Sequence, residues 1–263
     1  MPGNGFSDSH FREHFADGRG PREIERPLIV EAPVAIEING IGYAVMMATP
    51  ADLTDYATGF LLSEQIIADA AELVSVDPQP VANGGWMLRL IVSGGSAAPL
   101  LARARLRLSE GSCGLCGIES LEQVLRPLAP VTARLDVSEA AIFAASAALR
   151  DHQPLGRATG AAHAAAFCDP RGTIVAVRED VGRHNALDKL IGTLARRGVS
   201  PAEGFILLSA RCSFELVQKT VIAGCPVLAT ISAASTLAAE QARALGVKLY
   251  SLVRHDSLLG PVD

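Results

Sequence analysis

Short apolar strands alternate with helices through the second half of the chain, and this order constrains the fold more than any other feature. The strand patterns GFILLSA, PVLATIS and VKLYSLV are separated by two helical patterns, which end at Gly224 and Gly246, and a further helix ending near Gly198 comes before them. Strands joined by helical crossovers predict a largely parallel sheet. Open sheets of this type bind ligands beyond the carboxyl ends of their strands.

Four loops are therefore expected together at one edge of this sheet. They span residues 179–184, 210–213, 232–235 and 254–257, each directly after a strand pattern. Two earlier strand patterns, AAHAAAFCD and GTIVAVRE, are joined by the sequence DPRG, which is typical of a turn. Most of the chemically interesting polar residues of this half fall in the four loops.

The first half of the chain predicts a smaller mixed α+β unit. Residues 27–49 alternate apolar and polar positions around Asn39-Gly40, the residue pair that best fits a two-residue hairpin turn. Asp52 is positioned to cap a following helix, with Asp55 at its third position, and strands are expected within residues 73–108. Farther along, Ser138 is placed to cap an alanine-rich helix.

These patterns predict an α/β protein of four segments. A mobile polar tail is expected over residues 1–25, a small α+β domain over 26–110, a Cys-x-x-Cys loop over 111–117, and an α/β domain with a largely parallel sheet over 118–263.

Charge and apolar content exclude several classes of protein. The 263 residues carry a formal net charge of −5, which argues against a non-specific nucleic-acid-binding protein. No apolar run reaches membrane-spanning length, and the first 25 residues lack the apolar stretch of a signal peptide. Five cysteines is an odd number in a chain of this length, so a secreted disulfide framework is not expected and a reducing, cytoplasmic compartment fits better.

The sequence REDVGRHNALDK has the residues of an anion-binding corner. Arg178, Asp180, Arg183 and His184 precede Asn185, which we expect to cap the next helix. Free N–H groups and the helix dipole favour anions at such a position, and the basic side chains add hydrogen-bond donors. The alternative is a charged, solvated turn before a capped helix, and spacing alone does not separate the two interpretations.

Two further residues near the predicted edge also allow two interpretations. Cys212 lies at a helix start, where the thiol pKa is lowered, but a small buried cysteine is the interpretation that we favour. His163 lies in an alternating strand among alanines, which suits either a packed histidine or the floor of a pocket. Cys168 and Cys225 lie in or beside apolar strands and are expected in the core.

Cys113 and Cys116 stand two residues apart among glycines, ahead of a helical pattern. Structural zinc would need two more ligands, and no second Cys-x-x-Cys is present. A thioredoxin-type redox pair would open the first βα unit, whereas this pair follows a long β region. A mobile loop that presents a nucleophilic thiolate fits better, because the thiolate is the form that attacks sulfur.

Taken together, the motifs CGLCGIESLE, TGAAHAAAF, VREDVGRHNALDKLIG, SARCSFELVQK and ISAASTLAAEQA resemble the FdhD/NarQ family of formate dehydrogenase accessory proteins. The resemblance runs from about Pro27 to Val253. It implies a sulfur carrier that accepts sulfane sulfur from a cysteine desulfurase. The sulfur then goes to the molybdenum or tungsten bis(pterin guanine dinucleotide) cofactor of formate dehydrogenase. It also implies a cytidine-deaminase-like C-terminal fold, binding of guanine nucleotides such as GDP, and a homodimer.

By position, the resemblance makes Cys113 the persulfide cysteine and Cys116 the second thiol. The family's cofactor-binding stretch falls on the segment after the last strand, although the tail SLVRHDSLLGPVD lacks the tyrosine that is usual there. Altogether, the residues that we expect to bind the cofactor are His163, Arg178, Asp180, Arg183, His184, Arg211, Leu252, Val253, Arg254, His255, Asp256 and Ser257.

Two other functions stay open at this point. One is a non-catalytic chaperone that binds the pterin cofactor and docks on the dehydrogenase. The other is a zinc-dependent enzyme acting on nucleosides, but the deaminase zinc signature is missing, since no glutamate stands two residues after His163 and no Pro-Cys-x-x-Cys is present. No metal ligands are therefore predicted.

Overall fold

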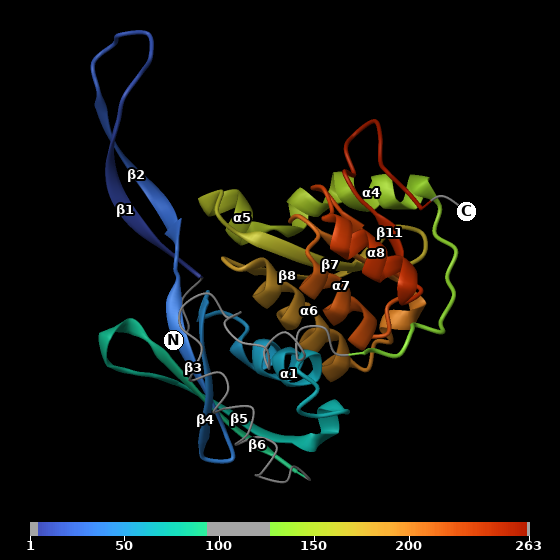
Figure 1. Ribbon diagram of the computed structural model, residues 1–263. Helices are drawn as coiled ribbons and strands as arrows, with labels where there is room; N and C mark the ends of the chain where they lie inside the picture. The colour runs from blue at the N-terminus through green and yellow to red at the C-terminus, as the bar shows by residue number, and fades with distance from the viewer. Residues whose placement is uncertain (1–4, 94–126, 262–263) are drawn as a thin grey trace.

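The computed structural model describes residues 5–93 and 127–261, which form three sheets and their covering helices (Figure 1). The first two sheets lie in the N-terminal part. Their strands are β1 (Phe6–Glu13), β2 (Arg22–Ile29), β3 (Ala32–Ile38), β4 (Ile41–Ala48), β5 (Leu73–Pro80) and β6 (Trp86–Val92). β1 and β2 form a two-stranded antiparallel ribbon, and the other four pair in the order β4-β3-β6-β5.

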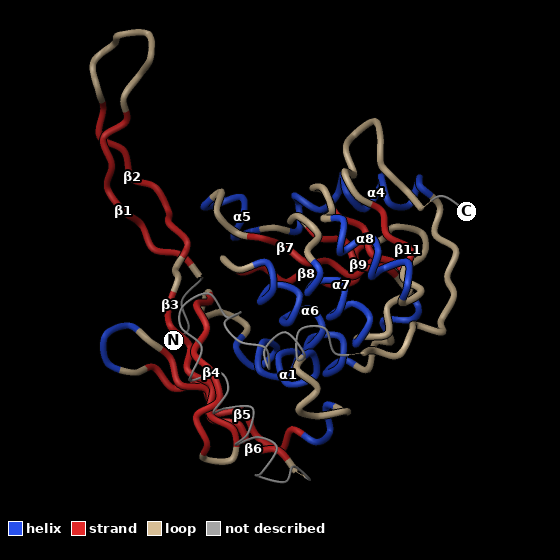
Figure 2. Tube along the Cα trace, viewed as in Figure 1, coloured by secondary structure: helices blue, strands red, loops and turns tan. Residues whose placement is uncertain are grey.

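The ribbon replaces part of the predicted mobile tail. Residues 1–25 are too polar and too evenly charged to read as strands, yet β1 pairs with β2 over eight residues each. Figure 2 shows the ribbon extending away from the rest of the molecule, with only its base near α5 (Pro154–Thr159). The predicted tail is therefore corrected, from Phe6 on, to a regular hairpin.

The turn between β3 and β4 is the predicted one. Asn39 and Gly40 have φ angles of 48° and 79°, and β3 and β4 are antiparallel. Both angles are positive, as a type I′ hairpin turn requires, which explains the Asn-Gly pair. The helix α1 (Leu53–Ser63) begins after Asp52 as expected, but the Asp52 side chain makes no capping hydrogen bond. That carboxylate lies 3.6 Å from the guanidinium of Arg178 instead.

The C-terminal part holds a five-stranded sheet in the order β11-β10-β9-β7-β8. Its strands are β7 (His163–Cys168), β8 (Ile174–Asp180), β9 (Phe205–Leu208), β10 (Val227–Thr230) and β11 (Lys248–Tyr250). The predicted parallel pairing of β9, β10 and β11 is confirmed. β7 is antiparallel to both its neighbours, so β8 runs in the same direction as the other three strands.

Helices cover both faces of this sheet. They are α4 (Glu139–Leu149), α6 (Arg183–Arg197), α7 (Phe214–Ile222) and α8 (Thr236–Ala244). Short 3₁₀ turns lie at Arg150–His152 and Pro201–Glu203 in this part, and at Ala70–Glu72 and Ala82–Gly84 next to β5 in the N-terminal part. The apolar sides of α6, α7 and α8 share one core with the sheet, and α4 shares a second core with its other face. The predicted cap of α4 is present, since Ser138 Oγ accepts from the N–H of Ala141. The cytidine-deaminase-like description stays an expectation of the resemblance.

α1 joins the two parts of the molecule. One side of α1 packs on the four-stranded sheet, and the other side packs along α6. The two helices approach closely because glycines face each other at the crossing: a Cβ on Gly59 would lie 1.7 Å from the carbonyl oxygen of Asp188. This contact fixes the position of α6 and therefore of the sheet edge where α6 begins.

Candidate functional site

The candidate site lies at the carboxyl edge of the five-stranded sheet. Because β8, β9, β10 and β11 run in one direction, the four loops that follow them open at the same edge, as predicted. β7 runs the opposite way, so its first residue, His163, also lies at this edge, where it pairs with Asp180. The fold therefore brings together residues from the REDVGRHN, TGAAHAAAF and SARCSF motifs.

The N-terminus of α6 has no side-chain cap. The helix begins at Arg183 and its N-cap residue is Gly182, so the predicted cap by Asn185 is wrong. Asn185 is the third residue of the helix, and its amide donates to the Met47 carbonyl at 2.8 Å and to Asp180 Oδ1 at 3.0 Å. The partners of Asn185 are tertiary, and among residues 5–93 and 127–261 no side chain caps the first N–H groups of this fifteen-residue helix.

Arg183 contributes a second unused donor at the same place. Its Nε atom is buried and has no hydrogen-bond partner in the part of the chain that the structure describes. Leaving a charged buried donor unpaired is costly, whereas an anion bound at the helix N-terminus would satisfy it. An uncapped helix start and an orphaned guanidinium nitrogen together fit a phosphate or pyrophosphate group.

The pKa of His163 is affected by several charged residues at this edge of the sheet. Its pKa is lowered first by burial and then by the charge of Arg183, while Asp180 acts in the opposite direction. Smaller contributions from His184 and Arg211 also lower it. The structure therefore groups four of the predicted basic residues, and it keeps His163 largely neutral at pH 7.

This pKa shift makes a prediction about stability. A histidine whose folded pKa lies below its ordinary value of about 6.5 binds fewer protons in the folded than in the unfolded state. Its contribution to stability is therefore present above pH 6.5 and is lost as the pH falls towards the lowered pKa. In urea unfolding between about pH 5 and pH 7, His163→Gln should lose less stability on acidification than the wild-type protein. His152→Gln, at an exposed histidine, should keep the wild-type slope, and equal slopes for all three proteins would contradict the prediction.

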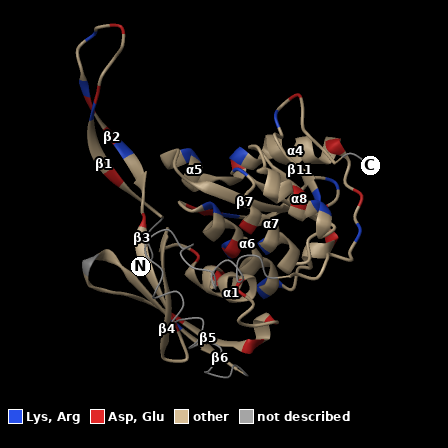
Figure 3. Cartoon of the chain, viewed as in Figure 1, with Lys and Arg blue, Asp and Glu red and all other residues tan. Residues whose placement is uncertain are grey.

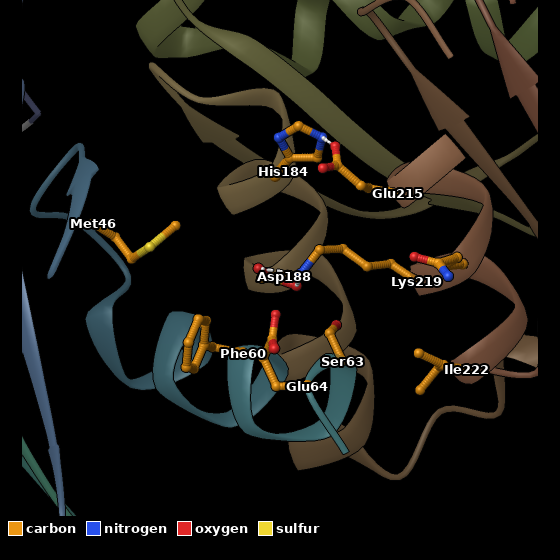
Figure 4. A pocket seen from close by; sticks show the side chains of 10 residues that line it. Met46, Phe60, Ser63, Glu64, His184, Asp188, Glu215, Lys219 and Ile222 are labelled. Atoms are coloured by element: carbon orange, nitrogen blue, oxygen red, sulfur yellow. Dashed lines mark hydrogen bonds and ion pairs between the residues drawn. The ribbon is translucent and has the colours of Figure 1, made fainter. Parts of the chain in front are cut away.

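His184 connects this edge to a cavity of about 200 Å³ between α1, α6 and α7 (Figure 4). Its Nε2 lies 2.8 Å from Glu215 Oε2 and 3.3 Å from Ser213 Oγ. The hydrogen bond with His184 is the largest cause that lowers the pKa of Glu215. One turn deeper, Asp188 and Lys219 form a second pair at 2.7 Å, so two hydrogen-bonded pairs line the cavity in succession.

Sequence reasoning missed Glu215 and Lys219, although a signal was present. His184 and Asp188 are four residues apart, and so are Glu215 and Lys219. Residues at this spacing lie on one face of a helix, so two facing helices with matched charges could have been inferred.

Two predicted site residues are used elsewhere. Arg178 donates through Nε and Nη2 to Asp55 Oδ2 at 2.8 and 2.7 Å, which ties β8 to α1. Asp180 is fully buried and is already bound by Lys189 Nζ at 2.6 Å and by the Thr49 N–H at 3.0 Å. Both side chains hold the two parts of the molecule together, so the structure does not offer them to a cofactor.

The segment after β11 forms an exposed turn at the same edge. The N–H of Arg254 donates to the Ser257 carbonyl at 2.8 Å, and Leu252 has a φ of 51°. Val253 is buried, so its side chain packs in the core rather than at the site. Arg254, His255, Asp256 and Ser257 are exposed, as is Arg211 in the loop after β9.

The three described cysteines are buried, and burial disfavours their thiolate forms. Burial is the main cause that raises the pKa of Cys168, Cys212 and Cys225, each to about 12. The favoured interpretation of Cys212, a buried small residue, is confirmed. Cys113 and Cys116 lie outside the described residues.

Neither a metal site nor a membrane-spanning helix is found where the structure is described. Residues 5–93 and 127–261 hold no group of three or more His, Cys, Asp or Glu side chains placed to bind a metal ion. Within the same ranges, no helix is both long and apolar enough to cross a membrane.

Comparisons with known proteins agree on one family. The model of the FdhD/NarQ family matches residues 29–259. A sulfur carrier protein FdhD from Variovorax paradoxus is 48% identical over 230 residues, which cover 88% of this chain and 82% of that protein. A sulfur carrier protein FdhD from Bordetella petrii is 45% identical over 225 residues, covering 86% and 81%.

A solved structure shows the same fold. The crystal structure of a formate dehydrogenase accessory protein from Desulfotalea psychrophila aligns with a TM-score of 0.72 and covers 97% of this chain and 96% of that one. At 21% identity this likeness concerns the fold alone. Because the family model matches residues 29–259, and because a relative is 48% identical over most of both chains, this chain belongs to the FdhD/NarQ family.

Proposed function

We propose that this protein is a cytoplasmic sulfur carrier for the maturation of formate dehydrogenase. It takes sulfane sulfur from a cysteine desulfurase onto Cys113 and delivers it to a molybdenum- or tungsten-bound pterin guanine dinucleotide. The relatives named as sulfur carrier proteins support the sulfur-carrying part. The observation that carries the cofactor part is the uncapped start of α6 beside the orphaned Nε of Arg183.

The edge suits a dinucleotide cargo. A pyrophosphate needs several donors along one line, and α6 offers its first N–H groups together with the Arg183 guanidinium. His184 and Arg211 flank this position, and the exposed turn at Arg254–Ser257 extends the same edge. These groups bind and orient the cargo, and the metal stays part of the cargo.

Sulfur loading is a thiolate exchange. The thiolate sulfur of Cys113 attacks the terminal sulfur of the donor's persulfide, one S–S bond forms, and the other breaks. The desulfurase leaves as its own thiolate, so the exchange needs no outside oxidant. Cys168, Cys212 and Cys225 cannot compete, because thiols with a pKa of about 12 are almost never ionised at pH 7. The proposal therefore gives loading to the Cys-x-x-Cys pair alone.

A comparison of two variants by two measurements tests this division of tasks. Cys113→Ala should bind GDP with wild-type affinity but gain no persulfide when incubated with a desulfurase and cysteine. Arg183→Ala should gain the persulfide but bind GDP roughly ten- to a hundred-fold more weakly, because one charge-assisted hydrogen bond contributes about 1.5–3 kcal/mol. Calorimetry gives the affinity, and mass spectrometry of the loop peptide gives the added sulfur.

Formate dehydrogenase activity in a deletion host completes the test. Both variants should fail to activate the dehydrogenase, and Arg171→Ala, at an exposed turn on the far edge of the sheet, should activate it normally. Full activation by Cys113→Ala together with Cys116→Ala would replace the sulfur carrier with a non-catalytic cofactor chaperone. Unchanged GDP affinity in Arg183→Ala would make the start of α6 a structural feature only.

A further inference from the structure

The start of α6 collects positive charge without an acidic residue of its own. Arg183 and His184 are its first two residues, and its first turn contains no acidic side chain. Because a helix N-terminus is the positive end of the dipole, basic side chains there raise the local potential further. Figure 3 shows, however, that acidic residues are interspersed with the basic ones around β8, α6 and α7. The charge that a ligand meets therefore depends on which of these acids are already neutralised.

Two neighbouring acids are neutralised by lysines. Asp180 is bound by Lys189 at 2.6 Å, and Asp188 is bound by Lys219 at 2.7 Å. Both carboxylates are also buried, so neither is presented to a ligand. These two pairs add no net charge to the edge.

Glu215 is different, because its partner is a histidine. Its Oε2 lies 2.8 Å from His184 Nε2, and its side chain is 51% exposed. A histidine carries a positive charge only when it is protonated, so it does not neutralise a carboxylate as a lysine does. Figure 4 shows the two side chains facing each other, one from α6 and the other from α7. Glu215 therefore keeps negative charge beside the start of α6.

The charge of Glu215 reaches the residue that would bind the ligand. The hydrogen bond with His184 is the largest cause that lowers the pKa of Glu215, burial acts in the opposite direction, and the positive charge of Arg183 lowers it further. An electrostatic interaction is mutual, so the Glu215 carboxylate also acts on an anion that is bound at Arg183. Physiological salt screens charges over about 8 Å, which leaves interactions between neighbouring side chains in force.

We propose that Glu215 is a specificity-determining residue that limits the negative charge of the ligands bound at the start of α6. The inference rests on the proposed function, because the ligand that it favours is the pyrophosphate within a dinucleotide cargo. Such a bridging pyrophosphate carries about two negative charges, whereas GDP carries about three and GTP about four. Arg183 and the first N–H groups of α6 attract all of these ligands, and Glu215 repels the more highly charged ones most strongly. The carboxylate thus favours the cargo over free nucleotides that compete for the same donors.

A pair of nucleotides tests this selection by charge. GDP and GTP differ by one phosphate, and calorimetry in magnesium-free buffer gives the ratio of their affinities. Glu215→Gln removes the charge but keeps an oxygen that accepts a hydrogen bond from His184. The ratio of GTP to GDP affinity should rise at least about threefold in this variant, and the rise should shrink at high salt. Glu203→Gln, at an exposed acid before the opposite end of β9, should leave the ratio unchanged.

A second background separates the effect of Glu215 from that of His184. Removing the carboxylate also changes the surroundings of the His184 ring, and a loss of positive charge there would lower the affinity for every anion. The comparison is therefore repeated with His184→Gln as the starting protein. Glu215→Gln should again raise the ratio, because Arg183 is unchanged. A rise that vanishes in this background would assign the effect to His184 and overturn the proposal.

The same measurements distinguish this inference from the proposed function. Arg183→Ala should weaken GDP binding whatever the role of Glu215. If it does, and Glu215→Gln leaves the ratio unchanged or weakens both nucleotides equally, Glu215 only supports the structure, and the charge selection is overturned while the anion-binding edge stands. If neither Arg183→Ala nor Glu215→Gln changes the binding of either nucleotide, the start of α6 is not the anion site, and the proposal falls with it.

Discussion

Lys189→Met is expected to lower the free energy of unfolding by about 3–5 kcal/mol, because it leaves the Asp180 carboxylate buried without its counter-ion. The two side chains are fully buried, and Lys189 Nζ lies 2.6 Å from Asp180 Oδ2. Lys189 also donates to the Thr49 carbonyl at 2.9 Å, across 140 positions of sequence. Urea unfolding followed by circular dichroism measures the loss.

The same substitution at an exposed pair is the control. Lys248 lies 2.9 Å from Asp136, whose side chain is fully exposed. Water and salt screen a pair at the surface, so Lys248→Met should change stability little. If both substitutions cost the same, the buried pair does not stabilise the fold beyond an ordinary surface contact.

The Lys189 pair has a second consequence, for the candidate site. Asp180 Oδ1 accepts from the N–H of Gly182, the residue that precedes α6, at 2.7 Å. The carboxylate thus helps to position the start of α6. Thr49 connects the same loop to the N-terminal part, because its N–H donates to Asp180 Oδ2 and its Oγ1 accepts from the N–H of Val181. Lys189→Met should therefore weaken GDP binding as well as the fold, although Lys189 itself is too deeply buried to touch a ligand.

Local patterns predicted the elements that depend on local forces. The Asn39-Gly40 turn, the Ser138 cap and the glycine that ends α6 were all predicted, since positive φ angles and capping oxygens are encoded within a few residues. The alternation of strands and helices also predicted that four loops lie at one edge of the sheet. Strands joined by helical crossovers run in the same direction, so the loops that follow them open at the same edge.

Tertiary partners could not be predicted in this way. Asparagine is a common N-cap residue, but the Asn185 amide donates to the Met47 carbonyl, 138 residues away in the sequence. Lys189 interrupts the amphipathic pattern of α6 and would be expected in water, yet it is buried because Asp180 and Thr49 surround its amine. β1 carries two aromatic side chains among polar ones, a pattern that favours a tail over a strand when the pairing strand is unknown.

The crossing of α1 and α6 gives the other large expected effect. There, a Cβ on Gly192 would lie 1.9 Å from the carbonyl oxygen of Asp55, and a Cβ on Gly59 would lie 1.7 Å from the carbonyl oxygen of Asp188. Alanine normally stabilises a helix interior by about 0.5–1 kcal/mol relative to glycine. Here the sign should reverse, because the obstacle is backbone and cannot rotate away.

Gly192→Ala should therefore cost about 3 kcal/mol of stability, at the upper end of overpacking effects. Separating the helices would also loosen Asp55, whose Oδ2 accepts from Thr193 Oγ1 at 2.8 Å and from Arg178. Gly42→Ala is the matched control, because no atom lies within 4 Å of its added Cβ. Thermal unfolding of the two variants separates the effect of close packing from that of glycine flexibility. A stability loss shared by both variants would mean that the helix crossing is not what requires glycine. A loss confined to Gly192→Ala would show that the close contact between α1 and α6 is what holds α6, together with the anion-binding edge, against the N-terminal part.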